Sequence, residues 1–189
     1  MSAPGIVVIL WVLFYSYWMI AAVGVKRNIR TEGRTERWSV RLLLLGLIFL
    51  VLRMPAVRHA IQQFQSAHFG PATEAIGFLL CLCGFAFAIW ARFHLGRNWG
   101  QPMTLKQGHE LITTGPYRFV RHPMYSGAIV MYLATPLMWG SGAALIISVA
   151  ISALFVWRTG MEDRTLQAEL PGYHEFAAQT TCRLVPGLW

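Results

Sequence analysis

The chain has few charged residues and very few acidic ones. Charged side chains make up 13% of its 189 residues, against about 25% in soluble domains. Hydrophobic residues make up 56%, and the mean hydropathy is +0.48, which excludes an ordinary soluble domain. The net charge is +8, but no basic patch interleaved with aromatic residues accompanies it, so we expect no nucleic-acid partner.

Cysteine is also scarce, because the chain contains only Cys81, Cys83 and Cys182. These three show neither a CxxC spacing nor a paired arrangement, so we expect no zinc site and no disulfide framework. The histidines lack metal-ligand spacing, and no metal site is predicted. No basic segment precedes the first apolar run, which is long enough to span a bilayer. We therefore interpret this run as a retained helix and not as a cleaved signal peptide.

Long apolar runs are the dominant feature of the sequence. A helix rises 1.5 Å per residue, so about 20 apolar residues cross a hydrocarbon core of roughly 30 Å. The expected spans cover residues 5–25, 39–57, 72–91, 123–138 and 142–160. The sequence thus predicts an all-α polytopic membrane bundle of five transmembrane helices, formed by one domain over residues 1–189. It leaves the oligomeric state open.

Lys and Arg residues are distributed unevenly between the predicted loops. They follow the first, third and fifth spans, and only Arg53 and Arg58 fall on the other side. The positive-inside rule places the basic loops in the cytosol. We therefore expect a multi-pass integral membrane protein, of a bacterial inner membrane to judge by its compact chain. The polar segments at residues 92–123 and 158–183 would share the cytosolic face.

Polar and turn-forming residues concentrate at positions 108–127. Gly115 and Pro116 interrupt regular structure there, and Arg121 places a fixed cation beside the titratable ring of His122. Pro123 suits the first turn of a helix because it has no N–H to satisfy. This segment is predicted to form a binding loop, with a C-terminal helix after the fifth span and a tail that folds back.

Five motifs between residues 92 and 186 carry a family resemblance. They are Leu95-Gly96-Arg97-Asn98-Trp99, His109-Glu110-Leu111 before Thr114-Gly115-Pro116-Tyr117, Arg121-His122-Pro123-x-Tyr125-x-Gly127, Glu162-Asp163-x-x-Leu166, and Arg183-Leu184-Val185-Pro186. This pattern resembles the isoprenylcysteine carboxyl methyltransferase family. Its Arg-His-Pro-x-Tyr core is shared with phospholipid N-methyltransferases and, more loosely, with sterol reductases. The motifs therefore specify the superfamily more firmly than the substrate.

The resemblance implies a membrane enzyme that transfers a methyl group from S-adenosylmethionine to the carboxylate of a lipid-linked cysteine. It assigns cofactor binding to His109, Glu110, Leu111, Ile112, Tyr117, His122, Pro123, Met124, Tyr125 and Glu162. It assigns contact with the substrate to Arg158, the predicted catalytic residue. Asp163 stands where the family usually has a second Glu, and its role stays open. Asn98 and Trp99 are expected to position the loop.

Simpler interpretations of these residues exist. Arg158 lies one helical turn before Glu162, so the two could form an ion pair, or Arg158 could reach the membrane interface. The family resemblance implies instead that the guanidinium of Arg158 holds the substrate carboxylate with two hydrogen bonds. His122 could serve as a base, bind the cofactor or cap the loop. Arg121 is expected to balance charge in the loop or to meet lipid phosphate.

Methyl transfer to a carboxylate needs no general base, because the acceptor is already ionised at neutral pH. Two other functions remain open. The chain could methylate a lipid amine or a small thiol, or it could be a non-catalytic lipid-binding membrane protein. In every case the expected partners are a lipid-linked or small-molecule acceptor and the membrane lipid.

Overall fold

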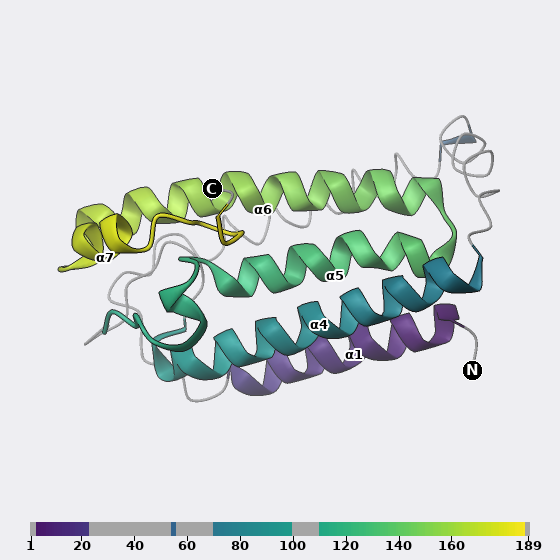
Figure 1. Ribbon diagram of the computed structural model, residues 1–189, viewed down its shortest axis with the longest axis horizontal. Coiled ribbons are helices and arrows are strands. Elements are labelled where there is room, and N and C mark those ends of the chain that lie inside the picture. Colours follow the sequence, from purple (N-terminus) through teal and green to yellow (C-terminus); the bar gives the residue numbers. More distant parts are fainter. Residues whose placement is uncertain (1–2, 23–53, 56–69, 100–109, 188–189) are drawn as a thin grey trace.

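The computed structural model describes residues 3–22, 54–55, 70–99 and 110–187. The described elements are α1 (Ala3–Ala21), α4 (Pro71–Leu95), η1 (Gly96–Asn98), η2 (Gly115–Arg118), α5 (Pro123–Trp139), α6 (Gly142–Glu169) and α7 (Tyr173–Gln179). Within these ranges every regular element is a helix, which confirms the all-α prediction (Figure 1).

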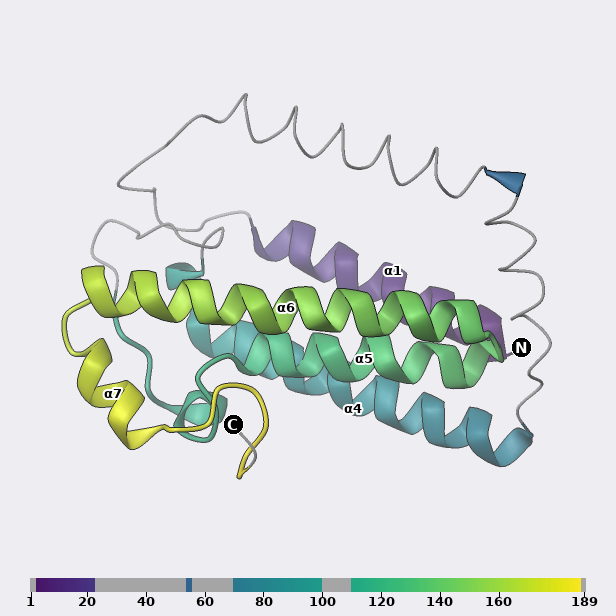
Figure 2. The same cartoon turned by 90° about the horizontal axis from the view of Figure 1, so that it is seen from above.

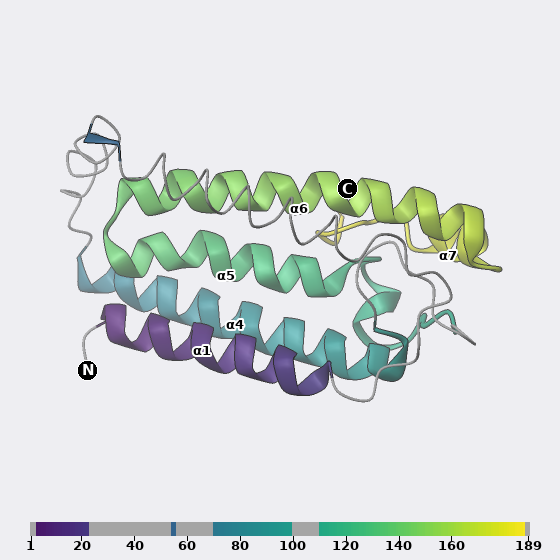
Figure 3. The same cartoon turned by 180° about the vertical axis from the view of Figure 1, so that it is seen from behind.

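Among the described elements, the four long helices run alongside one another. Helix α5 lies between α4 and α6, and α1 packs against both α4 and α5 (Figures 1 and 3). The core of this bundle consists of buried side chains from α1, α4 and α5, with Val7, Cys81 and Met131 fully enclosed. The short helices η2 and α7 lie at the end where α4 and α6 finish (Figure 2). All the motif segments therefore meet at one end of the bundle.

Among the residues that the structure describes, two helices are long and apolar enough to cross a membrane. They cover Pro71–Asn98 and Gly142–Glu169, and a shorter apolar helix covers Gly5–Ala21. The predicted spans at 72–91 and 142–160 are thus parts of longer helices, while α5 matches its prediction within one residue. The predicted span at 39–57 lies almost entirely outside the described residues. The five-span topology therefore stays a prediction.

Helices α4 and α5 approach each other closely through glycine. A Cβ atom at Gly84 would lie 2.6 Å from the carbonyl oxygen of Gly127, and one at Gly127 would lie 2.5 Å from that of Gly84. Neither position can hold a larger side chain without moving the helices apart. The small residues of the predicted third span thus pack within the chain, against the fourth span.

The hairpin between α5 and α6 is tight, as the sequence predicts. Gly140 ends α5 in the left-handed conformation, with φ of 63°, and the Ser141 side chain accepts a hydrogen bond from the Ala144 amide. Pro123 occupies the first turn of α5, as expected. These local signals fix the residues at which α5 and α6 begin. They thereby determine which residues of the two helices face each other.

The C-terminal segment folds back onto the loop before α5. The amide of Arg121 donates to the carbonyl of Cys182 at 3.0 Å, and the amide of His122 donates to the carbonyl of Arg183 at 2.9 Å. The Ser126 hydroxyl donates to the carbonyl of Leu184 at 2.5 Å. The prediction that the tail folds back is therefore confirmed, and the tail lies against the loop that precedes α5.

Candidate active site

A cavity of about 330 Å³ lies at the polar end of the bundle. Nine of the predicted site residues line it: Glu110, Leu111, Ile112, Tyr117, His122, Met124, Tyr125, Arg158 and Glu162. Pro123 is buried but does not reach the lining. His109 lies outside the described residues. The structure thus gathers side chains from the loop, α5 and α6 around one space.

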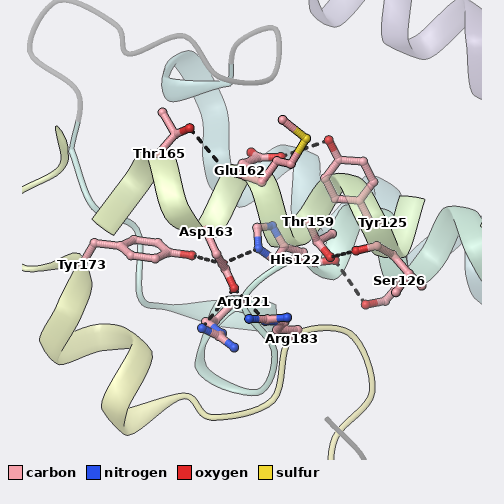
Figure 4. A network of polar contacts seen from close by, with 12 residues as sticks. Arg121, His122, Tyr125, Ser126, Thr159, Glu162, Asp163, Thr165, Tyr173 and Arg183 are labelled. Atoms are coloured by element: carbon pink, nitrogen blue, oxygen red, sulfur yellow. Dashed lines mark hydrogen bonds and ion pairs between the residues drawn. The ribbon is translucent and has the colours of Figure 1, made fainter. Parts of the chain in front are cut away.

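Glu162 and Arg158 project from the same face of α6 into this cavity. The Tyr125 hydroxyl donates a hydrogen bond to Glu162 Oε2 at 3.0 Å (Figure 4). Arg158 and Glu162 both lie in the described part of the chain and form no ion pair with each other, so the pair allowed by the sequence does not form. Both charged groups therefore face the cavity, where they can bind a ligand.

The Tyr117 hydroxyl is a buried polar group that faces the same space. Tyr117 lines the cavity and is 6% exposed. Among the described residues, no group forms a hydrogen bond with its hydroxyl. Burial raises the pKa of Tyr117 well above its usual range, and the negative charge of Glu162 adds to this effect. The group thus remains a neutral hydroxyl that needs a partner, which a bound ligand can supply.

Aromatic side chains form the part of the cavity that lies deeper in the bundle. Phe14, Tyr15 and Trp18 come from α1, Tyr132 from α5 and Phe155 from α6. The hydroxyls of Tyr15 and Tyr132 are hydrogen-bonded at 2.8 Å. None of these residues belongs to a motif, and the sequence analysis missed them all. Their only signal was their position in apolar runs, which every membrane-facing residue shares.

Asp163 is the centre of a buried polar cluster beside the cavity. Its carboxylate accepts from His122 Nε2 at 2.7 Å and from the Tyr173 hydroxyl at 2.5 Å, and it pairs with Arg121 at 3.1 Å and Arg183 at 2.9 Å (Figure 4). Arg121 therefore faces inward to a carboxylate. The interpretation that it meets lipid phosphate is not what the structure shows, because the buried acid offers it a closer partner.

Two opposing effects act on the pKa of Asp163. Burial raises it, while the hydrogen bond and charge of His122, the hydrogen bond from Tyr173 and the charge of Arg121 lower it, and the net shift is downward. Burial, reinforced by Asp163, raises the pKa of Tyr173. Asp163 is therefore an ionised acceptor, and Tyr173 is a protonated donor. The sequence analysis left the role of Asp163 open.

Asn98 and Trp99 both line the cavity beside the binding loop. The amide of Glu110 donates to Asn98 Oδ1 at 3.4 Å. Asn98 thus holds the start of the described loop against the end of η1. This contact agrees with the expectation that Asn98 positions the loop.

These features define a helical membrane protein with a cavity where its apolar helices meet its polar segments. The chain belongs to the phospholipid methyltransferase family, whose family model matches residues 72–170. The match extends from the start of α4 to the end of α6. It thus covers most of the residues that line the cavity.

The chain is also similar to individual curated proteins. The chain is 32% identical over 79 residues to the uncharacterized protein YpbQ of Bacillus subtilis (strain 168), covering 41% of this chain and 47% of that protein. It is 25% identical over 147 residues to the protein-S-isoprenylcysteine O-methyltransferase of Schizosaccharomyces pombe, covering 76% of this chain and 53% of that protein. The chain spans about half the length of the curated relatives it matches.

A solved structure shares the fold. It is that of the eukaryotic intramembrane Ras methyltransferase ICMT (isoprenylcysteine carboxyl methyltransferase), with a TM-score of 0.51 and 18% identity. The match covers 78% of this chain and 51% of that one. The resemblance to isoprenylcysteine carboxyl methyltransferases, inferred from the motifs, is therefore confirmed.

Proposed function

We propose that the protein is an S-adenosylmethionine-dependent methyltransferase that acts on the carboxylate of an isoprenylcysteine or a similar lipid-linked acceptor. One observation carries this proposal. Glu162, Arg158 and the unpartnered hydroxyl of Tyr117 all line the same cavity, which continues into an aromatic region between the apolar helices. The cavity thus offers an anion, a cation and an apolar surface to a single set of ligands.

The residues present fit S-adenosylmethionine. When bound, this cofactor supplies a methyl group on a positively charged sulfonium. The Glu162 carboxylate would pair with its ammonium group, and the Tyr117 hydroxyl would gain the hydrogen-bond partner that it lacks. Leu111, Ile112 and Met124 offer apolar surface to the adenosine. The cavity volume of about 330 Å³ lies within the range of about 300–1,000 Å³ that is usual for small-molecule sites.

Arg158 would bind the acceptor carboxylate. A guanidinium forms two parallel hydrogen bonds with a carboxylate and so fixes its orientation. Because Arg158 lies one turn of α6 before Glu162, it would hold the acceptor carboxylate beside the same cofactor whose ammonium group pairs with Glu162, so that one carboxylate oxygen can approach the sulfonium methyl group. The contribution to the rate would come from alignment in a site with little water, where opposite charges attract strongly.

The aromatic region favours an acceptor with an apolar chain. Phe14, Trp18 and Phe155 line the part of the cavity that lies between the apolar segments of α1 and α6. Phe14 belongs to the buried core, and Trp18 and Phe155 pack against it. A lipid-linked carboxylate could therefore enter with its charged group at Arg158 and its chain among these rings.

Methylation of a lipid amine is the second candidate. His122 is held by Asp163 through Nε2, which is how a carboxylate orients an imidazole base in other enzymes. An amine acceptor must lose a proton before it can attack, whereas a carboxylate need not. A kcat/KM that rises with pH through the range in which an imidazole loses its proton would favour the amine. A flat profile over this range would favour the carboxylate.

The direct test is methyl transfer by the purified full chain in detergent. The probe acceptor is an N-acetylated, S-prenylated cysteine, and the matched control is its carboxamide, which lacks the anionic oxygen. We expect a methyl ester from the acid and no product from the carboxamide. Product from a phospholipid amine but not from the prenylated acid would replace the proposed acceptor. No S-adenosylmethionine binding at all would leave the non-catalytic lipid-binding protein as the better account.

A further inference from the structure

Asp163 differs from its neighbour Glu162 in what it faces. Successive residues of a helix point about 100° apart, so Glu162 can line the cavity while Asp163 lies behind the lining. Three of the four groups bound to Asp163 do line the cavity: Arg121, His122 and Tyr173. Asp163 therefore reaches the cavity only through other side chains.

The carboxylate of Asp163 holds one particular tautomer of His122. An ionised carboxylate only accepts hydrogen bonds, so His122 Nε2 must carry the proton in the 2.7 Å contact. In the neutral imidazole this leaves Nδ1 as an acceptor. Loss of the carboxylate would free the ring to rotate or to exchange tautomers. The hydrogen-bonding pattern that His122 presents in the cavity thus depends on Asp163.

The same carboxylate also holds the C-terminal segment. Arg183 Nε lies 2.9 Å from Asp163, and the backbone of residues 182–184 accepts hydrogen bonds from Arg121, His122 and Ser126. Main-chain hydrogen bonds and a buried ion pair therefore join the tail to the loop before α5. Arg183 itself does not line the cavity, so its contact with Asp163 links the tail to the site indirectly.

An amide cannot replace this carboxylate. His122 Nε2 and the Tyr173 hydroxyl donate to Oδ1 of Asp163, and the guanidiniums of Arg121 and Arg183 pair with Oδ2. An asparagine whose amide oxygen faced the two cations would turn its NH₂ group towards His122 and Tyr173, where an acceptor is needed. The guanidiniums of Arg121 and Arg183 would also lose their shared counter-charge in a buried place. The arrangement therefore requires an anion at this position.

We propose that Asp163 is the positioning residue of the site. It fixes the Nε2–H tautomer of His122, and it ties Arg121, Tyr173 and Arg183 of the C-terminal segment around one side of the cavity. Ligand binding therefore depends on the tail. This inference rests on the proposed function for the identity of the ligand. It assigns to the second acid of the Glu162-Asp163 pair a task separate from that of the first.

The test uses the full chain in detergent with two readouts. The first is ¹⁵N NMR of protein labelled at histidine, with the His122 signals identified from their loss in His122→Asn. The second is the Kd for S-adenosylmethionine. Asp163→Asn is expected to abolish the fixed Nε2–H tautomer and to weaken binding by about tenfold or more, as when the partner that orients a ligand-binding side chain is removed. Asp163→Glu, which keeps the anion, should retain the wild-type tautomer.

Two further variants complete the design. Glu169→Gln removes an exposed acid from the same helix and should change neither readout. Arg183→Gln removes the guanidinium that pairs with Asp163 from outside the cavity lining. It should still weaken S-adenosylmethionine binding, which keeps the inference testable if Asp163→Asn does not fold.

Three results would overturn the inference. They are an unchanged His122 tautomer in Asp163→Asn, equal losses in Asp163→Glu and Asp163→Asn, and unchanged affinity in Arg183→Gln. If the wild type does not bind S-adenosylmethionine, the proposed function fails, and the NMR readout then decides the role of Asp163 alone.

Discussion

The two faces of α5 are packed in different ways. Towards α4, glycines bring the two backbones into contact, and a Cβ at Gly84 would lie 2.6 Å from a carbonyl oxygen of α5. Towards α6, α5 contributes Tyr125 and Tyr132 to a cavity lined by aromatic and charged groups. One face thus forms a rigid support, and the other holds side chains around a space. The comparison shows how a small membrane protein can build an open site on a closely packed pair of helices.

The largest effect is expected from filling the close contact. Gly84→Val would place its side chain against the Gly127 carbonyl and the Met131 side chain, both of which lie within 3.0 Å of an added Cβ. Overpacking typically costs about 1–3 kcal/mol, and more where backbone must move. We expect loss of folded protein, measured by thermal unfolding in detergent. Gly160→Ala is the control, because an added Cβ there meets nothing within 4 Å; an equal loss in both variants would contradict the account.

The second effect concerns the open face of α5. Arg158→Lys keeps the positive charge but loses the two-pronged hydrogen bond, so we expect kcat/KM for the prenylated acid to fall by about 10²–10³, the usual loss when one oriented donor is removed. S-adenosylmethionine affinity and the unfolding temperature should stay near the wild-type values. Retention of wild-type kcat/KM would show that Arg158 does not hold the acceptor.

A third prediction concerns the stability of the protein at low pH. The folded-state pKa of Asp163 is lowered, so its stabilising contribution is present above the ordinary Asp pKa of about 3.9 and is lost as the pH falls through and below that value. We therefore expect the unfolding temperature of the wild type to fall between about pH 5 and pH 3. The unfolding temperature of Asp163→Asn should be lower than that of the wild type at about pH 5, and it should fall less between about pH 5 and pH 3. Parallel curves for the two proteins would show that another group carries the acid sensitivity.

The smallest effect is expected at the hydrogen bond that joins Tyr15 of α1 to Tyr132 of α5. Tyr15→Phe and Tyr132→Phe each remove one hydroxyl of the 2.8 Å pair. Tyr15 is exposed, and a neutral hydrogen bond contributes about 0.5–1.5 kcal/mol. A double-mutant cycle on unfolding free energies should give a coupling at the low end of this range. No coupling would show that this hydrogen bond does not help to hold α1 against α5.

Much of the site could be predicted from sequence because its residues lie in short motifs. Glu110 to Ile112, Tyr117, and His122 to Tyr125 each lie within one segment whose turns are set by local signals such as Gly115-Pro116 and Pro123. Arg158 and Glu162 share a helix face because of helical periodicity. The family pattern then placed these segments together, and the cavity lining agrees with it.

The end of α4 could not be predicted from polarity. Arg92 and His94 suggested a loop after residue 91, but the helix continues to Leu95. Arg92 is buried, its guanidinium donates to the carbonyl oxygens of Ala21 and Gly96, and it lies over the ring of Trp99 at 4.8 Å. A charged residue can thus lie in the last turn of a helix when free carbonyl oxygens at the ends of its own and a neighbouring helix accept its hydrogen bonds.

The cluster around Asp163 could not be predicted either. Arg183 lies 20 residues along the chain from Asp163 and Arg121 lies 42 residues before it, and no periodicity relates them. Only the fold of the tail onto the loop brings these groups together. The aromatic residues that α1 contributes to the cavity also depend on contacts between distant parts of the chain, because Tyr15 and Tyr132 are 117 residues apart.

Calorimetric titration of S-adenosylmethionine into the detergent-purified chain tests the central claim most directly. Wild type, Glu162→Ala and the control Glu169→Ala would be compared under the same conditions. The account predicts binding by the wild type and by Glu169→Ala, and its loss in Glu162→Ala, because Glu162 supplies the carboxylate that faces the cavity. Equal binding by all three proteins would contradict the assignment of the cavity, and absence of binding by the wild type would contradict the methyltransferase function itself.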